Sequence, residues 1–186
     1  MEKEVNNLQH LIDGCLRSNP VCQKDLYRQF YGYAMKICLL YTSRREEAAE
    51  ILNDAFLKVF TRLETFDRRL SFKTWLRRIL INAAIDYHRK NHHFPVFENL
   101  SNEIMLSEEM ELPNILPETE VLPILQKLSP AYRIVFNLYV MEEYSHQEIA
   151  EILNISQATS RSNLARAIQN LKSIMNMDKK IVSITK

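Results

Sequence analysis

The sequence predicts an all-α protein made of two small helical domains joined by an acidic linker. Its 186 residues include only two glycines, whereas strand-rich folds and phosphate-binding loops need more of them for tight turns and close backbone approach. Several segments also repeat apolar residues every three or four positions, which is the period of a helix with one buried face. With 46 % hydrophobic and 25 % charged residues, the chain has the composition of a globular protein.

The linker is marked by its charge. Residues 91–120 contain three prolines and seven acidic residues but no lysine or arginine. This stretch carries a formal charge of −7, whereas residues 1–90 carry +5 and residues 121–186 carry +3. Two basic segments around an acidic one indicate a polyanionic partner for the flanks. The expected parts are an N-terminal domain over 1–92, the linker over 93–120, a C-terminal domain over 121–176 and a tail over 177–186.

Three helices are expected in the N-terminal domain. Residues 25–41 form an amphipathic segment with several aromatic side chains. Residues 45–63 follow, and one face of this helix collects the apolar residues Ala48, Leu52, Ala55, Val59 and Leu63. Residues 71–90 give the clearest pattern, with one apolar sector made of Phe72, Trp75, Leu76, Ile79, Leu80, Ala83 and Tyr87.

The opposite side of the 71–90 helix carries a polar stripe of Arg78, Asn82 and Arg89. A solvated face is the simplest interpretation of such a stripe. However, Ile81 and Ile85 lie among these polar residues, and a purely solvated face does not need them. The pattern therefore favours an interaction surface.

The C-terminal domain is predicted from its helix boundaries. Residues 121–128 form a short apolar helix, and Ser129 with Pro130 begins a second helix that ends near residue 141. Ser145 and Glu148 have the spacing of a capping box, in which each residue satisfies a backbone N–H group of the other. This box opens a short helix that ends at residue 153.

The last helix is expected over 157–176, with Asn154 ending the preceding helix in a left-handed conformation and Ser156 capping the new one. A short helix, a tight turn and a second capped helix describe a helix-turn-helix, which places the second helix in the major groove of DNA. A helical hairpin that packs on protein is the alternative. The polar residues expected to point outward are Thr159, Ser162, Asn163 and Arg166, with Arg161 at the flank.

Other kinds of site find little support. The three cysteines, Cys15, Cys22 and Cys38, lack CxxC spacing and are expected to be reduced thiols. The cluster of His88, His92 and His93 has no carboxylate or cysteine at ligand spacing, so exposure or proximity to phosphate is expected rather than a metal. We expect no catalytic residues, no cofactor, no signal peptide and no membrane insertion, and hence a cytoplasmic protein without enzymatic activity.

With the runs RLSFKTWLRRILINAAID and EIAEILNIS, two segments of the chain together resemble the extracytoplasmic-function branch of bacterial RNA polymerase sigma factors. EEAAEILNDAFLKVFTRLETFDRRLSFKTWLRRILINAAIDYHRK, residues 46–90, resembles the promoter-melting region 2 of the family. LSPAYRIVFNLYVMEEYSHQEIAEILNISQATSRSNLARAIQNLK, residues 128–172, resembles the helix-turn-helix of region 4. The acidic linker lies where this branch has no region 3 domain. The run RLSFKTWLRRILINAAID is the specific part, because EIAEILNIS also resembles other helix-turn-helix regulators.

The resemblance implies three sets of site residues. Those that dock on the clamp coiled coil of core polymerase are Glu50, Ile51, Asn53 and Asp54. Those near the flipped base of the minus-10 element are Phe66, Phe72, Lys73, Arg78 and Asn82. Those that read the minus-35 element are Thr159, Arg161, Ser162, Asn163 and Arg166. The family often has arginine or glutamine at Asn163, a larger residue at Ala165 and glycine at Ala158, so the promoter sequence is not implied.

The expected function is that of a sigma factor, which binds core RNA polymerase and promoter DNA, directs initiation at a promoter subset and aids strand opening. The resemblance also makes an anti-sigma protein a candidate partner. The alternative is a freestanding helix-turn-helix regulator that binds DNA as a dimer. Such a regulator should bind duplex DNA tightly alone, whereas a sigma factor should need core polymerase.

Overall fold

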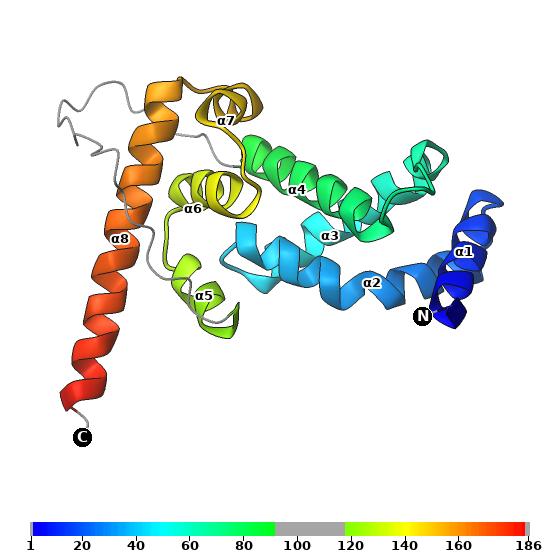
Figure 1. Ribbon diagram of the computed structural model, residues 1–186, viewed down its shortest axis with the longest axis horizontal. Helices are drawn as coiled ribbons and strands as arrows, with labels where there is room; N and C mark the ends of the chain where they lie inside the picture. Colours follow the sequence, from blue (N-terminus) through cyan, green and yellow to red (C-terminus); the bar gives the residue numbers. More distant parts are fainter. Residues whose placement is uncertain (1, 92–117, 185–186) are drawn as a thin grey trace. The chain divides into compact units, whose positions relative to one another are not determined.

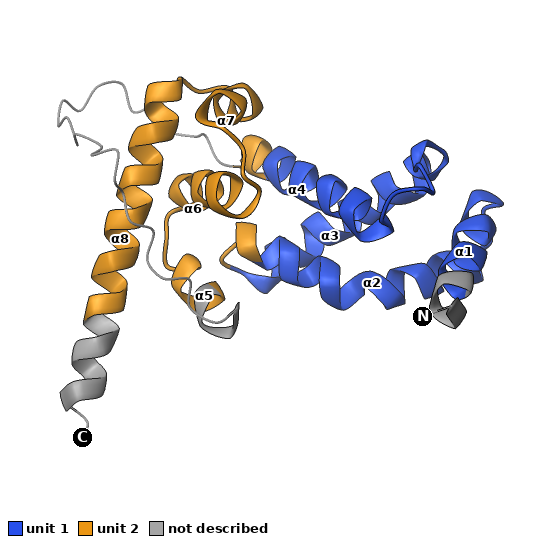
Figure 2. Ribbon diagram, in the orientation of Figure 1, with its two compact units in different colours: residues 1–39, 44–87 blue, residues 40–43, 88–186 orange. Residues whose placement is uncertain are grey.

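The computed structural model describes the backbone of residues 2–91 and 118–184, and the side chains of residues 7–91 and 122–176. All regular structure in these ranges is helical, as the sequence predicts. The chain divides into two units, one made of residues 1–39 and 44–87, the other of residues 40–43 and 88–186 (Figure 2). Most of the predicted linker, 93–120, lies outside the described residues.

The first unit contains two complete α-helices, a short 3-10 turn and all but the C-terminal ends of two further α-helices (Figure 1). Their bounds are α1 Glu2–Leu16, α2 Pro20–Tyr41, α3 Arg45–Arg62, η1 Leu63–Thr65 and α4 Phe72–Asn91. The face of α3 that the sequence predicts to be apolar is buried throughout, and so are Phe72, Leu76, Leu80 and Ala83 of α4. Burial of one apolar stripe on each helix is the main favourable contribution to this core.

The second unit is built around α8 (Gln157–Ile184). It also contains α5 (Glu118–Leu125), α6 (Pro130–Phe136) and α7 (His146–Leu153), and each of these three helices packs against α8 (Figure 1). The predicted second helix is continuous to residue 141, but its last turn, η2 (Asn137–Met141), is a π-helix. The buried Arg133 closes the end of α5, where its Nε donates to the carbonyl oxygen of Leu125 at 2.9 Å.

The sequence pattern did not indicate α1, and it began α2 five residues too late. Both omissions have the same cause: residues 1–24 lack a long apolar period, and their helices are fixed by packing. Leu11, Ile12 and Cys15 of α1 are buried, and a side chain at Gly14 would collide with Cys22 of α2. The three cysteines are buried thiols, and burial raises the pKa of Cys15 to about 11. In the described ranges, no helix is both long and apolar enough to cross a membrane.

Candidate functional site

An acidic and amide surface lies along the exposed side of α3. Glu50, Asn53 and Asp54 are exposed there, as the docking hypothesis requires. Ile51 is not: it is fully buried, so the expectation that it offers an exposed aliphatic contact is wrong. Its side chain falls on the inner face with Leu52 and Ala55, because a helix rotates about 100° per residue and the buried sector of α3 is wide.

The exposed apolar residue on this side of α3 is instead Leu57, which is 64 % exposed. It follows Asn53 by four positions and Asp54 by three, so the three side chains lie on one helical face. We name the exposed residues Glu50, Asn53, Asp54 and Leu57 the α3 surface. The sequence indicates Leu57 as an exposed apolar contact, because it is an apolar residue on the otherwise polar face of the helix.

The polar stripe on α4 lies where the sequence places it. Arg78, Asn82 and Arg89 are all exposed. Ile81 and Ile85 are buried, so they do not belong to the exposed surface and the argument drawn from them was wrong. The buried sector of α4 extends around the helix on both sides of the stripe. The stripe therefore stands as a purely polar surface with two arginines and one amide.

The segment before α4 rests on an aromatic cluster. Phe66 packs edge-on against Phe72 at 5.4 Å and lies 5.3 Å from the ring of Trp75, measured between ring centroids. Phe66 and Phe72 are 9 % and 3 % exposed, so both rings lie beneath the surface of this segment. They support the segment rather than forming its surface. Its exposed side chains are Arg68, Arg69, Leu70 and Ser71.

One ion pair joins this segment to α1, and a second lies within the segment. Arg68 pairs with Asp13 of α1 at 2.5 Å, and the Arg69 guanidinium pairs with Asp67 at 2.6 Å. The hydrogen bonds from Arg69 lower the pKa of the Asp67 carboxyl. Lys73, at the start of α4, is exposed and its Nζ lies 5.8 Å from the centre of the Tyr33 ring. The arrangement presents cations beside a hydrophobic support, which suits contact with a nucleic-acid backbone.

The helix-turn-helix is built as its capping residues predict. The Ser145 N–H donates to Glu148 Oε2 at 2.8 Å, and the Glu148 N–H donates to Ser145 Oγ at 3.3 Å, which completes the capping box. Asn154 ends α7 with φ 54° and ψ 50°, the left-handed conformation expected of it. The Thr159 N–H donates to Ser156 Oγ at 3.0 Å, so Ser156 caps α8.

The exposed side of α8 differs from the predicted one. Arg161 is exposed, and Thr159, Ser162 and Arg166 are half-buried. Asn163 is only 4 % exposed, so the prediction that it points outward is wrong. It falls on the same side of α8 as the buried Ser160, Leu164 and Ala167.

Gln157, the first residue of α8, is an exposed side chain that the sequence analysis missed. Arg161 Nη2 donates to Gln157 Oε1 at 3.3 Å, so the two lie on one face of the helix at the end that a helix-turn-helix inserts into DNA. The amide of glutamine can pair with an adenine edge and an arginine can pair with guanine or phosphate. The sequence indicates Gln157 through its position in the first turn of α8. Projecting the outward residues from the buried edge of the helix does not indicate it.

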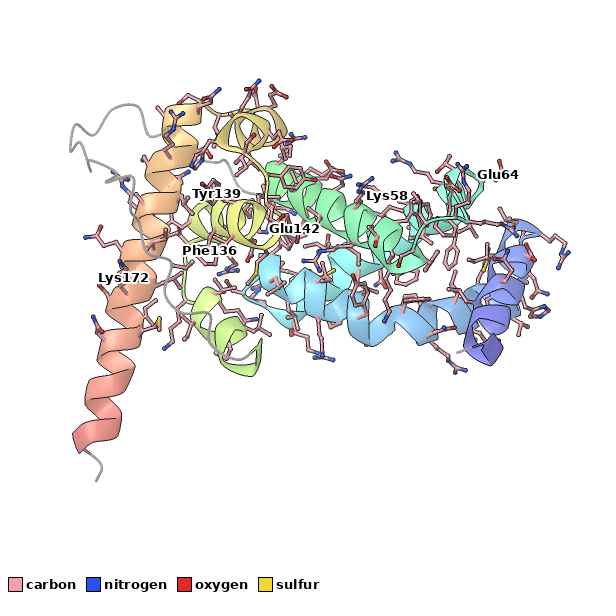
Figure 3. The ribbon with its side chains drawn as sticks, viewed as in Figure 1. Lys58, Glu64, Phe136, Tyr139, Glu142 and Lys172 are labelled. Carbon is pink, nitrogen blue, oxygen red and sulfur yellow. The ribbon has the colours of Figure 1, made fainter. Side chains whose placement is uncertain are left out.

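His146 links α7 to α8. Its Nδ1 lies 2.9 Å from Oγ of the buried Ser160, and its ring stacks on Tyr139, labelled in Figure 3, with centroids 4.6 Å apart. Burial, and secondly the charge of Arg161, lower the pKa of His146. The contact of His146 with Ser160 therefore joins the short helix α7 to α8.

His88, the one member of the histidine cluster that the structure describes, is not exposed as expected. His88 is 1 % exposed, and its Nε2 lies 2.6 Å from the carbonyl oxygen of Tyr41, so it has a structural position. His92 and His93 lie outside the described residues. Among the described residues, no three histidine, cysteine or acidic side chains are grouped in a way that could hold a metal ion.

Comparison with known families matches both units. Residues 26–94 match the family described as Sigma-70 region 2, and residues 119–171 match the family described as Sigma-70, region 4. The first match includes the α3 surface and the α4 stripe, and the second includes the helix-turn-helix. The sigma-factor hypothesis requires a family match outside the helix-turn-helix, whereas the hypothesis of a freestanding regulator does not require one.

Individual relatives cover most of the chain. It is 27 % identical over 154 residues to the ECF RNA polymerase sigma factor SigM of Bacillus subtilis, covering 82 % of this chain and 94 % of that protein. It is 29 % identical over 157 residues to the RNA polymerase sigma factor YlaC of the same organism, covering 82 % and 91 %. It is 28 % identical over 149 residues to the ECF RNA polymerase sigma factor SigW, also of B. subtilis, covering 74 % and 80 %.

Proposed function

The chain belongs to the extracytoplasmic-function branch of the sigma-70 family, and from this premise we propose how its surfaces divide the work of transcription initiation. As a sigma factor it binds core RNA polymerase and directs it to a subset of promoters. The α3 surface docks on polymerase, the α4 stripe and the segment before it contact the minus-10 element, and the start of α8 reads the minus-35 element. The observation that carries this division is that α3 and α4 expose chemically distinct surfaces, one with two acidic residues and one with two arginines.

The α3 surface suits a basic, partly apolar helical partner. Glu50 and Asp54 attract cations, Asn53 offers an amide, and Leu57 is an apolar side chain that water solvates poorly. A helix of the polymerase clamp with matching basic and apolar residues would cover these groups. The two acids reject nucleic acid, because phosphates repel carboxylates.

The α4 stripe and the start of α8 suit DNA. Arg78 and Arg89 can neutralise phosphates, and Asn82 between them can pair with the edge of an unstacked base. On α8, Arg161 and Gln157 occupy the first turns, where the major groove is read. The aromatic cluster of Phe66, Phe72 and Trp75 would keep the protein segment before α4 in place while a base is extracted from the minus-10 element. Extracting the base costs a few kcal/mol of unstacking.

The remaining parts of the proposal concern where and with whom the protein acts. A sigma factor acts with polymerase on the chromosome, so we place this chain in the cytoplasm and assign it no reaction of its own, since RNA synthesis belongs to the polymerase. An anti-sigma protein is a candidate regulator. Its occupancy of the α3 surface would compete directly with polymerase, which makes that surface the first place to seek it.

The test is run-off transcription with core polymerase and the full chain, combined with polymerase co-purification and a permanganate footprint of the melted region. Asp54→Lys should weaken polymerase binding without unfolding the protein, because exposed charges contribute little to stability. Asn82→Ala should keep polymerase binding and reduce strand opening. Glu151→Lys, a charge reversal at an exposed position of α7, is the matched control for Asp54→Lys.

Two results would contradict the division. Equal co-purification of Asp54→Lys and Glu151→Lys would show that α3 is not the docking helix. Normal permanganate reactivity with Asn82→Ala, at wild-type polymerase binding, would remove the α4 stripe from strand opening. Tight binding of the chain alone to duplex promoters would favour a freestanding regulator over a sigma factor.

A further inference from the structure

We infer that Tyr27 is a positioning residue of the α3 surface, which fixes the amide of Asn53 so that its NH₂ group faces the polymerase. Tyr27 lies on α2 and belongs to none of the surfaces described above. The inference rests on the proposed docking role of α3 and specifies the chemistry of that contact. It concerns a residue that acts through another, not one that touches the partner.

The geometry begins with one hydrogen bond between two helices. The Tyr27 hydroxyl donates to Asn53 Oδ1 at 3.1 Å, from α2 to α3. Oδ1 and Nδ2 of a primary amide point in different directions from the same carbon, so a donor held at Oδ1 selects one of the two ways in which the amide can be turned. Without it, an exposed asparagine samples both, and half of its orientations present the wrong group.

The Tyr27 ring is itself held in place. It packs against the ring of Phe56 at a centroid distance of 4.7 Å and against Tyr31 at 5.6 Å. Phe56 is buried in the core of the unit, so Tyr27 is anchored to a rigid part of the molecule. A hydroxyl on a fixed ring restrains its partner at a smaller loss of conformational entropy than a flexible side chain would.

The hydroxyl is also kept as a donor. Burial, and secondly the neighbouring Tyr31 hydroxyl, raise the pKa of Tyr27 above its usual value. The group is therefore protonated throughout the physiological range, and the orientation of Asn53 does not change with pH there.

The orientation defines what the polymerase must offer. With Oδ1 accepting from Tyr27, Asn53 presents N–H donors outward, so it needs an acceptor such as a carboxylate or a carbonyl oxygen. Asp54, the next residue, needs a cation, and Leu57, one turn further, needs an apolar side chain. The partner helix should thus carry an acceptor beside a basic residue, with an aliphatic residue about one turn away.

A double-mutant cycle tests the inference, with the full chain and core RNA polymerase and the dissociation constant as the readout. Asn53→Ala and Tyr27→Phe should each weaken binding by about 2- to 10-fold, the range expected for one hydrogen bond. Combining them should weaken binding no further than Asn53→Ala alone, because Tyr27 acts only through Asn53. Tyr31→Phe removes a hydroxyl one turn away and is the matched control, with an expected change within about twofold.

Asn53→Asp tests the same bond from the other side. Aspartate still accepts from Tyr27 but cannot donate to the partner, so binding should weaken at least as much as with Asn53→Ala.

If Asn53→Ala weakens binding and Tyr27→Phe does not, or if the two effects multiply, the inference fails while the docking role of α3 stands. If Asn53→Asp binds as tightly as the wild type, the outward group is not a donor and the inference fails. If neither Asn53→Ala nor Asp54→Lys weakens binding, the proposed function of α3 fails instead.

Discussion

The two helices proposed to contact DNA, α4 and α8, differ in how well their exposed sides follow from a simple helical projection. On α4, Arg78, Asn82 and Arg89 are exposed where the sequence places them. On α8, Arg161 is exposed, but Asn163 is buried although its residue type and its position in the projection both suggested the surface. The same projection thus placed all three polar residues of the α4 stripe on the surface but misplaced Asn163 of α8.

The packing partners of α8 set the edge of its exposed sector. Helices α5, α6 and α7 all pack against α8, so the covered sector of α8 is wide and includes small polar residues such as Ser160 and Asn163. A helix surrounded on several sides buries polar residues as well, and a projection centred on one apolar residue then misjudges the edge of the exposed sector.

The prediction with the largest expected effect compares the same change, asparagine to arginine, on α8 and on α4. Asn163→Arg should destabilise its unit by at least about 2 kcal/mol, because a larger and charged side chain must enter a covered site. Asn82→Arg should stay within about 0.5 kcal/mol of the wild type, because Asn82 is exposed. Chemical denaturation of the full chain, followed by circular dichroism, measures both. Equal stability of the two variants would mean that Asn163 is accessible after all.

Local chemistry predicted more of the fold than helical projection did. The capping box of Ser145 and Glu148, the left-handed Asn154 and the Ser156 cap depend on residues within a few positions of one another, and all were confirmed. The burial of Ile51, Asn163 and His88 depends on segments far away in the sequence. No pattern within one helix contains that information.

The candidate site shows the same division. Glu50, Asn53, Asp54, Arg78, Asn82 and Arg161 are exposed, as a binding surface requires, and their types follow from the sequence. The support beneath them could not be predicted. The contact of Tyr27 with Asn53 joins positions 26 residues apart, and the ion pair of Asp13 with Arg68 joins positions 55 apart. Helix packing brings these pairs together, and neither has a signature in the sequence.

A smaller effect is expected from two serines that occupy the same cap position in different helices of the second unit. Ser156→Ala should destabilise that unit by about 1 kcal/mol, because it removes the acceptor of the Thr159 N–H. Ser129→Ala should cost less than about 0.5 kcal/mol, because the side chain of Ser129 makes no capping hydrogen bond and Pro130 already favours the helical start. Thermal unfolding of the two variants side by side measures the difference. A larger loss for Ser129→Ala would contradict it.

The smallest expected effect is a pH dependence of stability. It arises from a histidine at the contact of α7 with α8 and not from the exposed stripe of α4. Folding lowers the pKa of His146, so the unfolded chain takes up the proton first as the pH falls. Stability should therefore decrease as the pH falls through about 6.5, the usual value for histidine, towards the lower value of the folded state. Glutamine at this position does not titrate, so His146→Gln should show a smaller loss of melting temperature between pH 7.5 and 5.5.

Two further variants separate this effect from other titrating groups. The hydrogen bonds from Ser145 lower the pKa of Glu148, so the stability that Glu148 contributes is lost only as the pH falls below the usual carboxyl range, and Glu148→Gln should leave the higher window unchanged. Arg161→Ala removes the second cause of the lowered pKa of His146, so it should raise that pKa and shrink the loss of stability between pH 7.5 and 5.5. If His146→Gln and the wild type lose the same melting temperature over that range, the histidine does not couple α7 to α8 through its neutral form. The recognition helix would then be held by its cap and its apolar edge alone.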